Sequence, residues 1–247
     1  MTQYEAEPDL LKDRIILVTG AGDGIGAVVA YEYAAHGATL VLLGRTQKKL
    51  ENVYDKIVDA GFPQPAIYPL ELTTARPEDY IILADTVMQE FGHLDGLLHN
   101  AAALGTLTPI EHYDIRLWTH IMRVNLTAPF LLTKECLPLL KNSDEASVIF
   151  TSANVGYKGQ AYWGAYAVSK AATDNLMEIL AEELEVNTNI RVNSVDPGQV
   201  RTRMHSLAYP GDTSLSNPKP EDITGIYLYL MGHESAGVTG ERFNAQN

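Results

Sequence analysis

Two side chains that can exchange protons, Tyr166 and Lys170, lie four residues apart in a segment whose pattern predicts a helix. That separation places both side chains on one helical face. A tyrosine with its ordinary pKa of roughly 10 is a poor base at neutral pH, but a neighbouring ammonium group favours the phenolate. The alternative is an exposed helix face, because a tyrosine and a lysine at this spacing are common by chance.

A hydroxyl group that can join this pair belongs to Ser152, which directly follows the apolar segment Val148–Thr151. That segment predicts a strand, and Tyr166 falls in the helix after it. Ligands of parallel sheets bind at the carboxyl ends of the strands, so Ser152 stands where a substrate is expected. The alternative is that Ser152 caps a helix or forms a turn.

The elements that position these residues follow from alternating apolar and amphipathic segments. Apolar segments predict strands at Ile15–Val18, Thr39–Leu43, Ile67–Leu72, Leu94–His99, Ala146–Thr151 and Ile190–Val195. Amphipathic segments predict helices at Ile25–His36, Gln47–Ala60, Pro77–Phe91, Glu111–Leu140 and Ala161–Glu185. Buried strands that alternate with helices are typical of a parallel sheet covered on both faces. We therefore expect an α/β fold, a doubly wound parallel sheet in a single domain over residues 1–247.

One loop-rich segment, from about residue 201 to residue 220, contains several prolines and a glycine. It is too short to separate two domains, and surface excursions of this kind often cover binding sites. We expect it to act as a substrate lid. Its side chains include apolar Met204, Leu207 and Tyr209 beside polar His205.

A glycine-rich segment, Thr19–Gly26, lies between the first predicted strand and the first predicted helix. Glycines let the backbone turn tightly and approach a ligand closely, and the amide groups at the start of the next helix favour a pyrophosphate. The alternative is a tight turn without a ligand. Because strand, turn and helix occur in the order that dinucleotide binding needs, we favour a Rossmann-like dinucleotide site.

The end of the second predicted strand indicates which dinucleotide binds. An acidic side chain there bonds the ribose 2′-hydroxyl of NAD, whereas an arginine accommodates the 2′-phosphate of NADP. Gly44, Arg45 and Thr46 follow the strand, without an acid. We therefore expect a preference for NADP(H), with NAD(H) possible. The alternative is a solvated Arg45 that opens the next helix, and Asp23 inside the turn is mildly unfavourable for a second phosphate.

The turn reads T-G-x-x-x-G-x-G, and in this form, with the other motifs in the same order, the chain resembles the short-chain dehydrogenase/reductase family over nearly its whole length. The resemblance implies a catalytic tetrad of Asn125, Ser152, Tyr166 and Lys170. In that tetrad Tyr166 exchanges a proton with the substrate, and Ser152 hydrogen-bonds the substrate oxygen. Lys170 lowers the tyrosine pKa and binds the nicotinamide ribose, and Asn125 helps to position a water and the lysine.

The same resemblance implies a set of cofactor contacts spread along the chain. The expected cofactor-binding residues are Gly20, Asp23, Gly24, Ile25, Gly26, Gly44, Arg45, Thr46, Glu71, Leu72, Asn100, Ala101, Tyr166, Lys170, Pro197, Gly198, Val200 and Thr202. Two positions depart from the family pattern. Glu71 is one methylene longer than the usual aspartate, and Ala102 stands where the family often has glycine.

Composition excludes several other classes of protein. The formal net charge of −13 opposes nucleic-acid binding. The single cysteine, Cys136, rules out intrachain disulfides, and the histidines show no metal-ligand spacing. The chain has no apolar segment near the roughly 20 residues that span a bilayer and no secretory signal. We therefore expect a cytoplasmic protein with no metal site and no membrane partner.

These features together predict an NADP(H)-dependent oxidoreductase that transfers hydride between nicotinamide and a small carbonyl or alcohol substrate. The family commonly forms dimers and tetramers, so a homodimer or homotetramer is expected. The alternative is a catalytically silent protein that senses NAD(P) on the same scaffold, because a fold alone does not establish chemistry.

Overall fold

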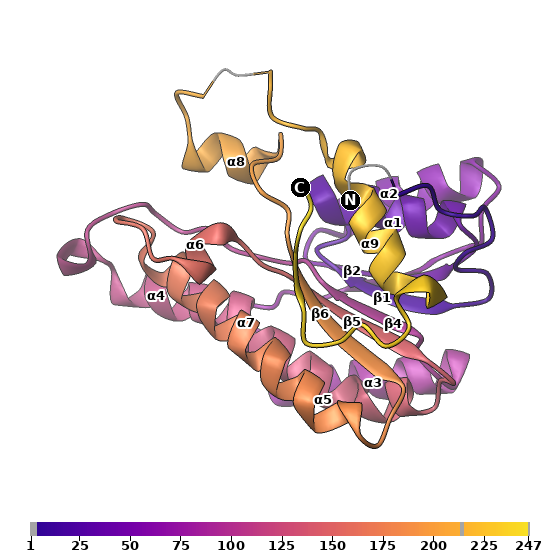
Figure 1. The fold of residues 1–247 in the computed structure, drawn as a ribbon. Coiled ribbons are helices and arrows are strands. Elements are labelled where there is room, and N and C mark those ends of the chain that lie inside the picture. Colours follow the sequence, from indigo (N-terminus) through magenta and orange to yellow (C-terminus); the bar gives the residue numbers. More distant parts are fainter. Residues whose placement is uncertain (1–3, 213–214, 247) are drawn as a thin grey trace.

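The structure, a computed structural model, describes residues 4–212 and 215–246. Its parallel strands form one sheet in the order β3-β2-β1-β4-β5-β6-β7 (Figure 1). The strands are β1 (Ile15–Thr19), β2 (Thr39–Gly44), β3 (Ala66–Pro69), β4 (Gly96–His99), β5 (Ala146–Thr151), β6 (Ile190–Asp196) and β7 (Arg242–Asn244). Strand order reverses between β1 and β4, and a doubly wound sheet opens a ligand crevice at that point. The predicted fold class is confirmed.

All six predicted strands are present, and their boundaries agree best where the residues are most buried. Every residue of β1, β4 and β5 is buried, so these strands consist of continuous apolar runs, as expected of a sheet covered on both faces. The edge strand β3 is shorter than its predicted range and only partly buried. The other edge strand, β7, is short and largely exposed, so it lacks the apolar pattern by which the other strands were predicted.

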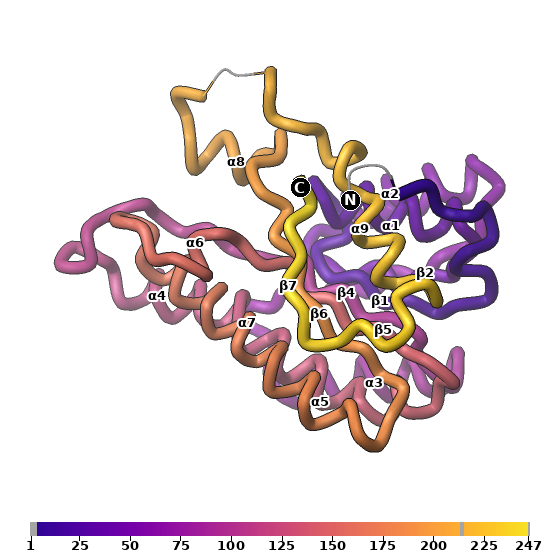
Figure 2. The backbone as a smooth tube through the Cα atoms, viewed as in Figure 1, coloured from indigo at the N-terminus to yellow at the C-terminus, as the bar shows by residue number. Residues whose placement is uncertain are grey.

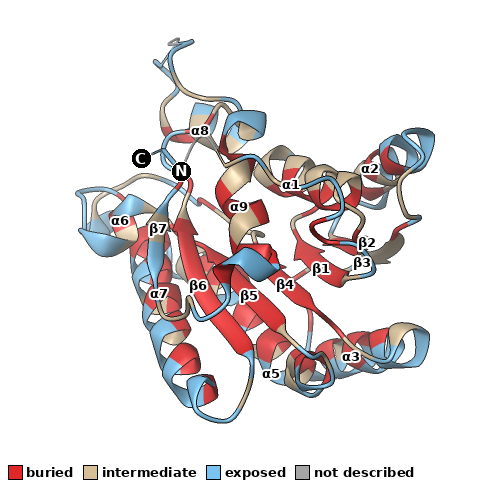
Figure 3. Cartoon of the chain, turned by 45° about the vertical axis from the view of Figure 1, so that its right-hand side comes forward, coloured by how far each residue is buried: buried red, intermediate tan, exposed pale blue. Residues whose placement is uncertain are grey.

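Two helical layers enclose the sheet (Figures 1 and 3). The helices are α1 (Gly24–Ala35), α2 (Gln47–Asp59), α3 (Pro77–Phe91), α4 (Ile115–Met122), α5 (Ala128–Lys141), α6 (Asn154–Tyr157), α7 (Gly164–Glu185), α8 (Arg203–Ala208) and α9 (Thr224–Met231). Helices α1, α2 and α9 pack on one face through a shared apolar core, while α3, α5 and α7 pack on the other. No helix among residues 4–212 and 215–246 is long and apolar enough to cross a membrane.

The prediction of one helix over Glu111–Leu140 is wrong. A short 3-10 turn at Ile110–His112 precedes α4, and a π turn, η2 (Arg123–Thr127), separates α4 from α5. Pro129 has no amide hydrogen to donate to the carbonyl of Asn125 four residues earlier. Ala128 donates instead to the carbonyl of Arg123, one residue further back than in an α-helix.

The helix predicted from Ala161 begins later, at Gly164. The backbone at Tyr162 has a φ of 75°, which lies in the left-handed region and interrupts helical geometry. The preceding residues form the separate short helix α6. The later start leaves Tyr166 in the first turn of α7, beside the carboxyl edge of the sheet.

The loop-rich segment predicted as a lid contains α8, which lies beyond the carboxyl edge of the sheet in Figures 1 and 2. Met204, Ala208 and Tyr209 pack against an apolar cluster that includes Tyr166. The Tyr209 ring centroid lies 5.9 Å from that of Trp163 on the neighbouring segment. The segment thus covers the end of α7, while its function as a substrate lid stays a prediction.

Candidate active site

One face of α7 presents Tyr166, Lys170 and Asp174, each four residues after the last. The three residues are 8%, 4% and 3% exposed, respectively. The Lys170 Nζ donates a 2.6 Å hydrogen bond to the carbonyl of Thr151 at the end of β5. It also lies 5.7 Å from the centroid of the Tyr166 ring. The predicted pair is therefore a buried one at the carboxyl edge of the sheet and not part of an exposed helix face.

Burial governs the protonation of this pair. It raises the pKa of the Tyr166 phenol, and the nearby Asp196 carboxylate raises it further. Burial also lowers the pKa of Lys170 to about 8, against the opposing influence of Asp174 and Asp196. At neutral pH the phenol therefore holds its proton, which suits Tyr166 to donate a proton to a developing alkoxide.

Asn125 lies in the π turn and ties three segments together. Its Oδ1 accepts from the amide of Ala103 at 2.7 Å, and its Nδ2 donates to the Ala103 carbonyl at 3.0 Å. The Nδ2 also donates to Ser169 Oγ on α7 at 2.9 Å. The backbone carbonyl of Asn125 accepts from the Thr173 hydroxyl at 3.4 Å. These bonds fix the loop after β4 against α7, and the expected help of Asn125 in placing a water near Lys170 stays a prediction.

The Ser152 hydroxyl has a partner inside the protein. It donates a 2.7 Å hydrogen bond to Oδ2 of Asp174, and both residues are buried. The next residue, Ala153, packs against the apolar cluster that contains Tyr166 and Trp163. The bond that Ser152 was expected to make to a substrate oxygen stays a prediction, and making it requires the hydroxyl to leave Asp174.

The glycine-rich turn fits a dinucleotide through its close packing on the end of β4. The backbone at Gly20 has a φ of 69°, which favours glycine. A Cβ at position 26 would lie 2.4 Å from both Asn100 Nδ2 and Gly20 O, so only glycine fits there. The hydroxyl of Thr19 accepts from the amides of Asn100 and Ala101 at 3.0 Å and 3.1 Å.

The helix that follows this turn begins with amide groups available to a pyrophosphate. Gly24, Ile25 and Gly26 open α1, and the first amides of a helix have no partner inside it. Asp23 caps one of them, accepting from the Gly24 amide at 2.8 Å. The Thr202 methyl group lies 3.7 Å from the Cβ position of Gly24. The start of the lid segment therefore faces the phosphate-binding turn.

The charges near the end of β2 suit the 2′-phosphate of NADP better than the sequence alone suggested. Arg45 is exposed, and Lys49 of α2 forms an ion pair with Asp23. The hydrogen bond from Lys49 is the main cause of the lowered pKa of Asp23. Sequence reasoning missed Lys49, although its position in the first turn of the helix after the second predicted strand is the signal that would have found it.

The remaining expected cofactor residues lie at or near the carboxyl ends of the strands. Leu72 is buried in the core, and the Glu71 carboxylate accepts from the Thr73 hydroxyl at 2.8 Å. Burial alone would raise the pKa of Glu71, but the Thr73 bonds and the charge of Arg45 lower it. The Glu71–Arg45 interaction places the ends of β2 and β3 close together. Gly44 ends β2, Thr46 follows it, and Pro197, Gly198 and Val200 follow β6 at the same edge of the sheet.

An apolar cluster surrounds the side of Tyr166 that faces the lid. Its buried members are Leu104, Val155, Trp163, Tyr166, Ala167 and Ala208, with Ala102, Leu107, Ala153, Met204 and Tyr209 packed against them. The Trp163 and Tyr166 ring centroids are 5.7 Å apart. A substrate that reaches the tyrosine hydroxyl here meets apolar and aromatic surface.

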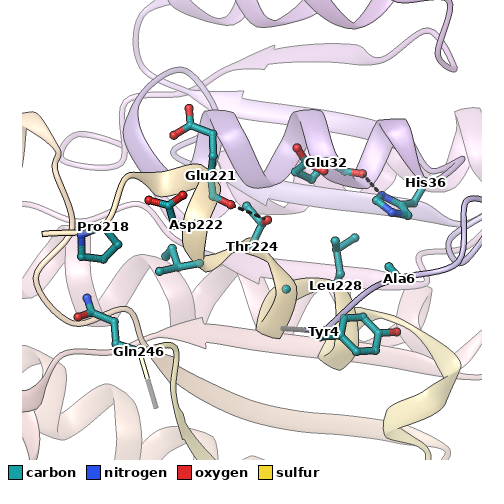
Figure 4. Close-up of a pocket in the computed structure, with 12 residues that line it drawn as sticks. Tyr4, Ala6, Glu32, His36, Pro218, Glu221, Asp222, Thr224, Leu228 and Gln246 are labelled. Carbon is teal, nitrogen blue, oxygen red and sulfur yellow. Dashed lines mark hydrogen bonds between the residues drawn. The ribbon is translucent and has the colours of Figure 1, made fainter. Parts of the chain in front are cut away.

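A separate cavity of about 650 Å³ lies between α1, α9 and the C-terminal segment (Figure 4). Its walls include Glu32, Glu221 and Asp222, with His36 at one side. None of the four predicted catalytic residues lines it. Its acidic wall repels phosphate groups, so this cavity does not suit a dinucleotide.

Comparison with known proteins assigns a family to this geometry. Residues 14–211 match the short chain dehydrogenase family. The chain is 44% identical over 243 residues to the uncharacterized oxidoreductase YciK of Escherichia coli strain K12, covering 98% of this chain and 96% of that protein. A short chain dehydrogenase structure from Pseudomonas syringae superposes with a TM-score of 0.97 at 54% identity, covering 99% of each chain.

A further solved structure contains a dinucleotide. A short chain dehydrogenase from Shigella flexneri, complexed with NADP, has a TM-score of 0.95 and 44% identity, covering 98% of this chain and 100% of that one. The similarity extends across the sheet, both helical layers and the lid segment. The chain therefore belongs to the short-chain dehydrogenase family of oxidoreductases.

Proposed function

We propose that this protein is an NADP(H)-dependent carbonyl reductase in which Tyr166 is the acid. The observation that carries the proposal is the buried Tyr166–Lys170 pair on α7, at the same sheet edge as the glycine-rich turn. Family membership supports oxidoreductase chemistry. Because its pKa is raised, the Tyr166 phenol holds its proton at neutral pH, which is the form that a general acid needs.

When bound, the dihydronicotinamide supplies the hydride that reaches the carbonyl carbon. Tyr166 donates its proton to the carbonyl oxygen as negative charge develops there. Lys170 lies close enough to stabilise the resulting phenolate, and the Thr151 carbonyl holds the ammonium group in place. The apolar cluster around Tyr166 excludes water, which strengthens these electrostatic interactions.

Arg45 and Lys49 support the preference for NADP(H). Both cations stand near the end of β2, and Lys49 offsets the charge of Asp23. The solved structure from Shigella flexneri with bound NADP is 44% identical to this chain. We expect NAD(H) to bind more weakly, because it lacks the phosphate that these side chains would contact.

Replacement of Tyr166 by phenylalanine tests the proposal. The variant keeps the ring and loses the acidic hydroxyl, so we expect NADPH consumption with a carbonyl library to fall about 1,000-fold or more. NADPH binding, followed by nicotinamide fluorescence, should persist because the ring still packs beside Trp163. Full turnover in Tyr166→Phe would remove the tyrosine from the mechanism.

A catalytically silent NAD(P) sensor is the second candidate. The engagement of Ser152 by Asp174 favours it, because the hydroxyl expected to polarise the substrate is occupied. Tight NADPH binding together with no turnover across the carbonyl and alcohol library would support this candidate over the reductase.

We also propose a homo-oligomer. Large apolar side chains on the outer surfaces of α5 and α7 remain exposed, among them Phe130, Val168 and Ile179, and such surfaces often form subunit interfaces. Light scattering should give a mass of at least twice 27.1 kDa. The double variant Phe130→Glu/Val168→Glu should shift that mass toward the monomer, whereas Lys141→Glu at the end of α5 should leave it unchanged.

A further inference from the structure

The direction of the Ser152 side chain follows from the alternation of β5. The amide of Ser152 donates to the carbonyl of Val195 at 2.7 Å, so the residue continues the pairing of β5 with β6. Thr151 points to the α9 face, where its hydroxyl lies 3.4 Å from that of Tyr227. Side chains alternate between the faces of a strand, and Ser152 accordingly points to α7.

On that face the Ser152 hydroxyl donates a hydrogen bond to the buried carboxylate of Asp174. Asp174 Oδ2 accepts the Ser152 hydrogen bond at 2.7 Å, while Oδ1 has no hydrogen-bond partner among the described residues. Turning Ser152 toward a substrate would therefore remove the hydrogen bond that the buried carboxylate does have. Buried charged groups without partners are strongly disfavoured, which holds the serine where it is.

The residue after Ser152 is Ala153, whose side chain is a methyl group. Ala153 has extended backbone, with φ −162° and ψ 148°, and it packs against the apolar cluster around Tyr166. Residue 153 therefore adds a methyl group, and no hydrogen-bond donor, to the apolar cluster that surrounds Tyr166.

We propose that residue 153 sets the electrophilicity of the substrates this enzyme accepts. With alanine there, residue 153 gives the substrate oxygen no hydrogen-bond donor to act beside that of Tyr166, and the site favours apolar carbonyl compounds activated by a neighbouring carbonyl, the α-dicarbonyl class. This inference rests on the proposed function. It assigns Ser152 to holding Asp174 rather than to contacting the substrate.

The reduction of an α-dicarbonyl compound needs a hydride and a proton, which NADPH and Tyr166 supply. The hydride of NADPH forms the new C–H bond as the C=O π bond breaks, and its electron pair moves to oxygen. Tyr166 supplies the proton, so the dicarbonyl is reduced to a hydroxyketone and NADPH is oxidised to NADP⁺. The adjacent carbonyl withdraws electron density from the reacting carbon and thereby offsets the missing second donor.

The test compares 1-phenyl-1,2-propanedione with acetophenone, which lacks the second carbonyl. We expect wild type to reduce the dione far faster than the ketone. Ala153→Ser adds a donor beside the developing alkoxide, and one such donor is worth about 100-fold in kcat. We therefore expect Ala153→Ser to raise kcat/KM for acetophenone by about that factor. The increase for the dione should be smaller, so the preference of the enzyme for the dione over acetophenone becomes narrower.

Matched variants distinguish the effect of the added hydroxyl from the effects of side-chain size and of protein stability. Ala153→Cys has nearly the size of Ala153→Ser but is a weak donor, so it should leave acetophenone reduction close to wild type. Ser152→Ala should lower the thermal midpoint, since Asp174 loses its donor, while dione turnover below that midpoint stays within about threefold of wild type. The double variant Ser152→Ala/Ala153→Ser should match Ala153→Ser in activity.

The outcomes distinguish this inference from the proposed function. If wild type reduces no carbonyl compound, the dione included, the proposed reductase function fails and the inference on residue 153 fails with it. If wild type reduces carbonyl compounds but prefers acetophenone to the dione, the proposed function stands and the inference is overturned. If Ala153→Ser gains no activity over Ala153→Cys, or if folded Ser152→Ala loses about 100-fold, the inference is overturned while the Tyr166→Phe result still decides the proposed function.

Discussion

Asp23 places a negative charge next to the expected 2′-phosphate of NADP, and its partners determine whether that charge matters. It accepts a hydrogen bond from the Gly24 amide at 2.8 Å and pairs with Lys49. The charge of Arg203 also lowers the pKa of Asp23, so two positive charges lie near this one negative charge. The local field therefore favours an anion, despite the acidic net charge of the whole chain.

Arg45 and Lys49 can be tested separately. We expect Arg45→Asp to weaken NADPH binding by about 10- to 100-fold, as for a lost hydrogen bond between charged groups, and to affect NADH far less. Lys49→Gln should weaken NADPH as well, because Asp23 is then unpaired. Calorimetric titration of both dinucleotides measures the change.

Lys48 supplies the control for this pair of cations. It is exposed and pairs with Glu51 rather than with Asp23, so Lys48→Gln should leave the ratio of the two affinities unchanged. An unaltered ratio in Arg45→Asp would remove the arginine from the account of cofactor choice.

At the scale of elements, the π turn between α4 and α5 determines where Asn125 lies. The missing amide of Pro129 removes the α-helical bond to the Asn125 carbonyl, and that carbonyl accepts from Thr173 on α7 instead. The wider turn also directs the Asn125 side chain to Ser169 and Ala103. A proline near the start of α5 therefore sets the contact between α5 and the helix that holds the tyrosine.

Pro129→Ala tests this role of the turn. The new amide can restore the regular helical bond, which would draw the Asn125 carbonyl away from Thr173. A small misplacement of this kind can cost up to about 100-fold in rate, so we expect kcat to fall by about 10- to 100-fold. Pro129 is buried, so the loss of its ring and the greater freedom of the unfolded chain should lower the thermal midpoint as well. The kcat values are therefore compared well below the midpoint of the variant.

The control for Pro129→Ala is Pro138→Ala, which also replaces a proline within α5. It lies more than two turns further along the helix and should leave kcat unchanged. Equal losses of activity in both variants would show that helix α5 as a whole, rather than its first turn, controls the site.

At the scale of the whole molecule, a buried histidine couples folding to pH. His99 at the end of β4 bonds Thr133 Oγ1 at 2.7 Å and stacks on Phe150 with centroids 4.7 Å apart. Burial, with a smaller contribution from the charge of Lys170, lowers its pKa from 6.5 to about 3. The unfolded chain therefore binds a proton between these pH values that the folded chain does not bind.

The free energy of unfolding should consequently fall as the pH drops from 6.5 toward 3. We expect His99→Gln to show a shallower decline, since glutamine can still bond Thr133 but does not titrate. Urea denaturation at several pH values measures both curves. His112→Gln, which changes an exposed histidine, should follow the wild-type curve, and parallel curves for His99→Gln and wild type would exclude His99 as the cause.

Much of the fold was predictable because its determinants are local. Continuous apolar runs such as Ile15–Val18 form strands wherever both faces are covered, and α3 occupies its predicted range of Pro77–Phe91. The glycine at position 26 and the four-residue spacing of Tyr166 and Lys170 are equally local signals. They were sufficient to identify the sheet edge and the family, and they led to the proposal that Tyr166 is the acid.

Tertiary structure alone decided which partner each polar side chain takes. Ser152 stands at the predicted place, but its hydroxyl meets Asp174, which lies 22 residues away. Lys49 meets Asp23 across the gap between α2 and the glycine-rich turn. The sequence by itself determined the elements and the catalytic helix face, because backbone periodicity is local. The hydrogen-bond partners depend on how strands and helices pack, and that packing is set by contacts far apart in the chain.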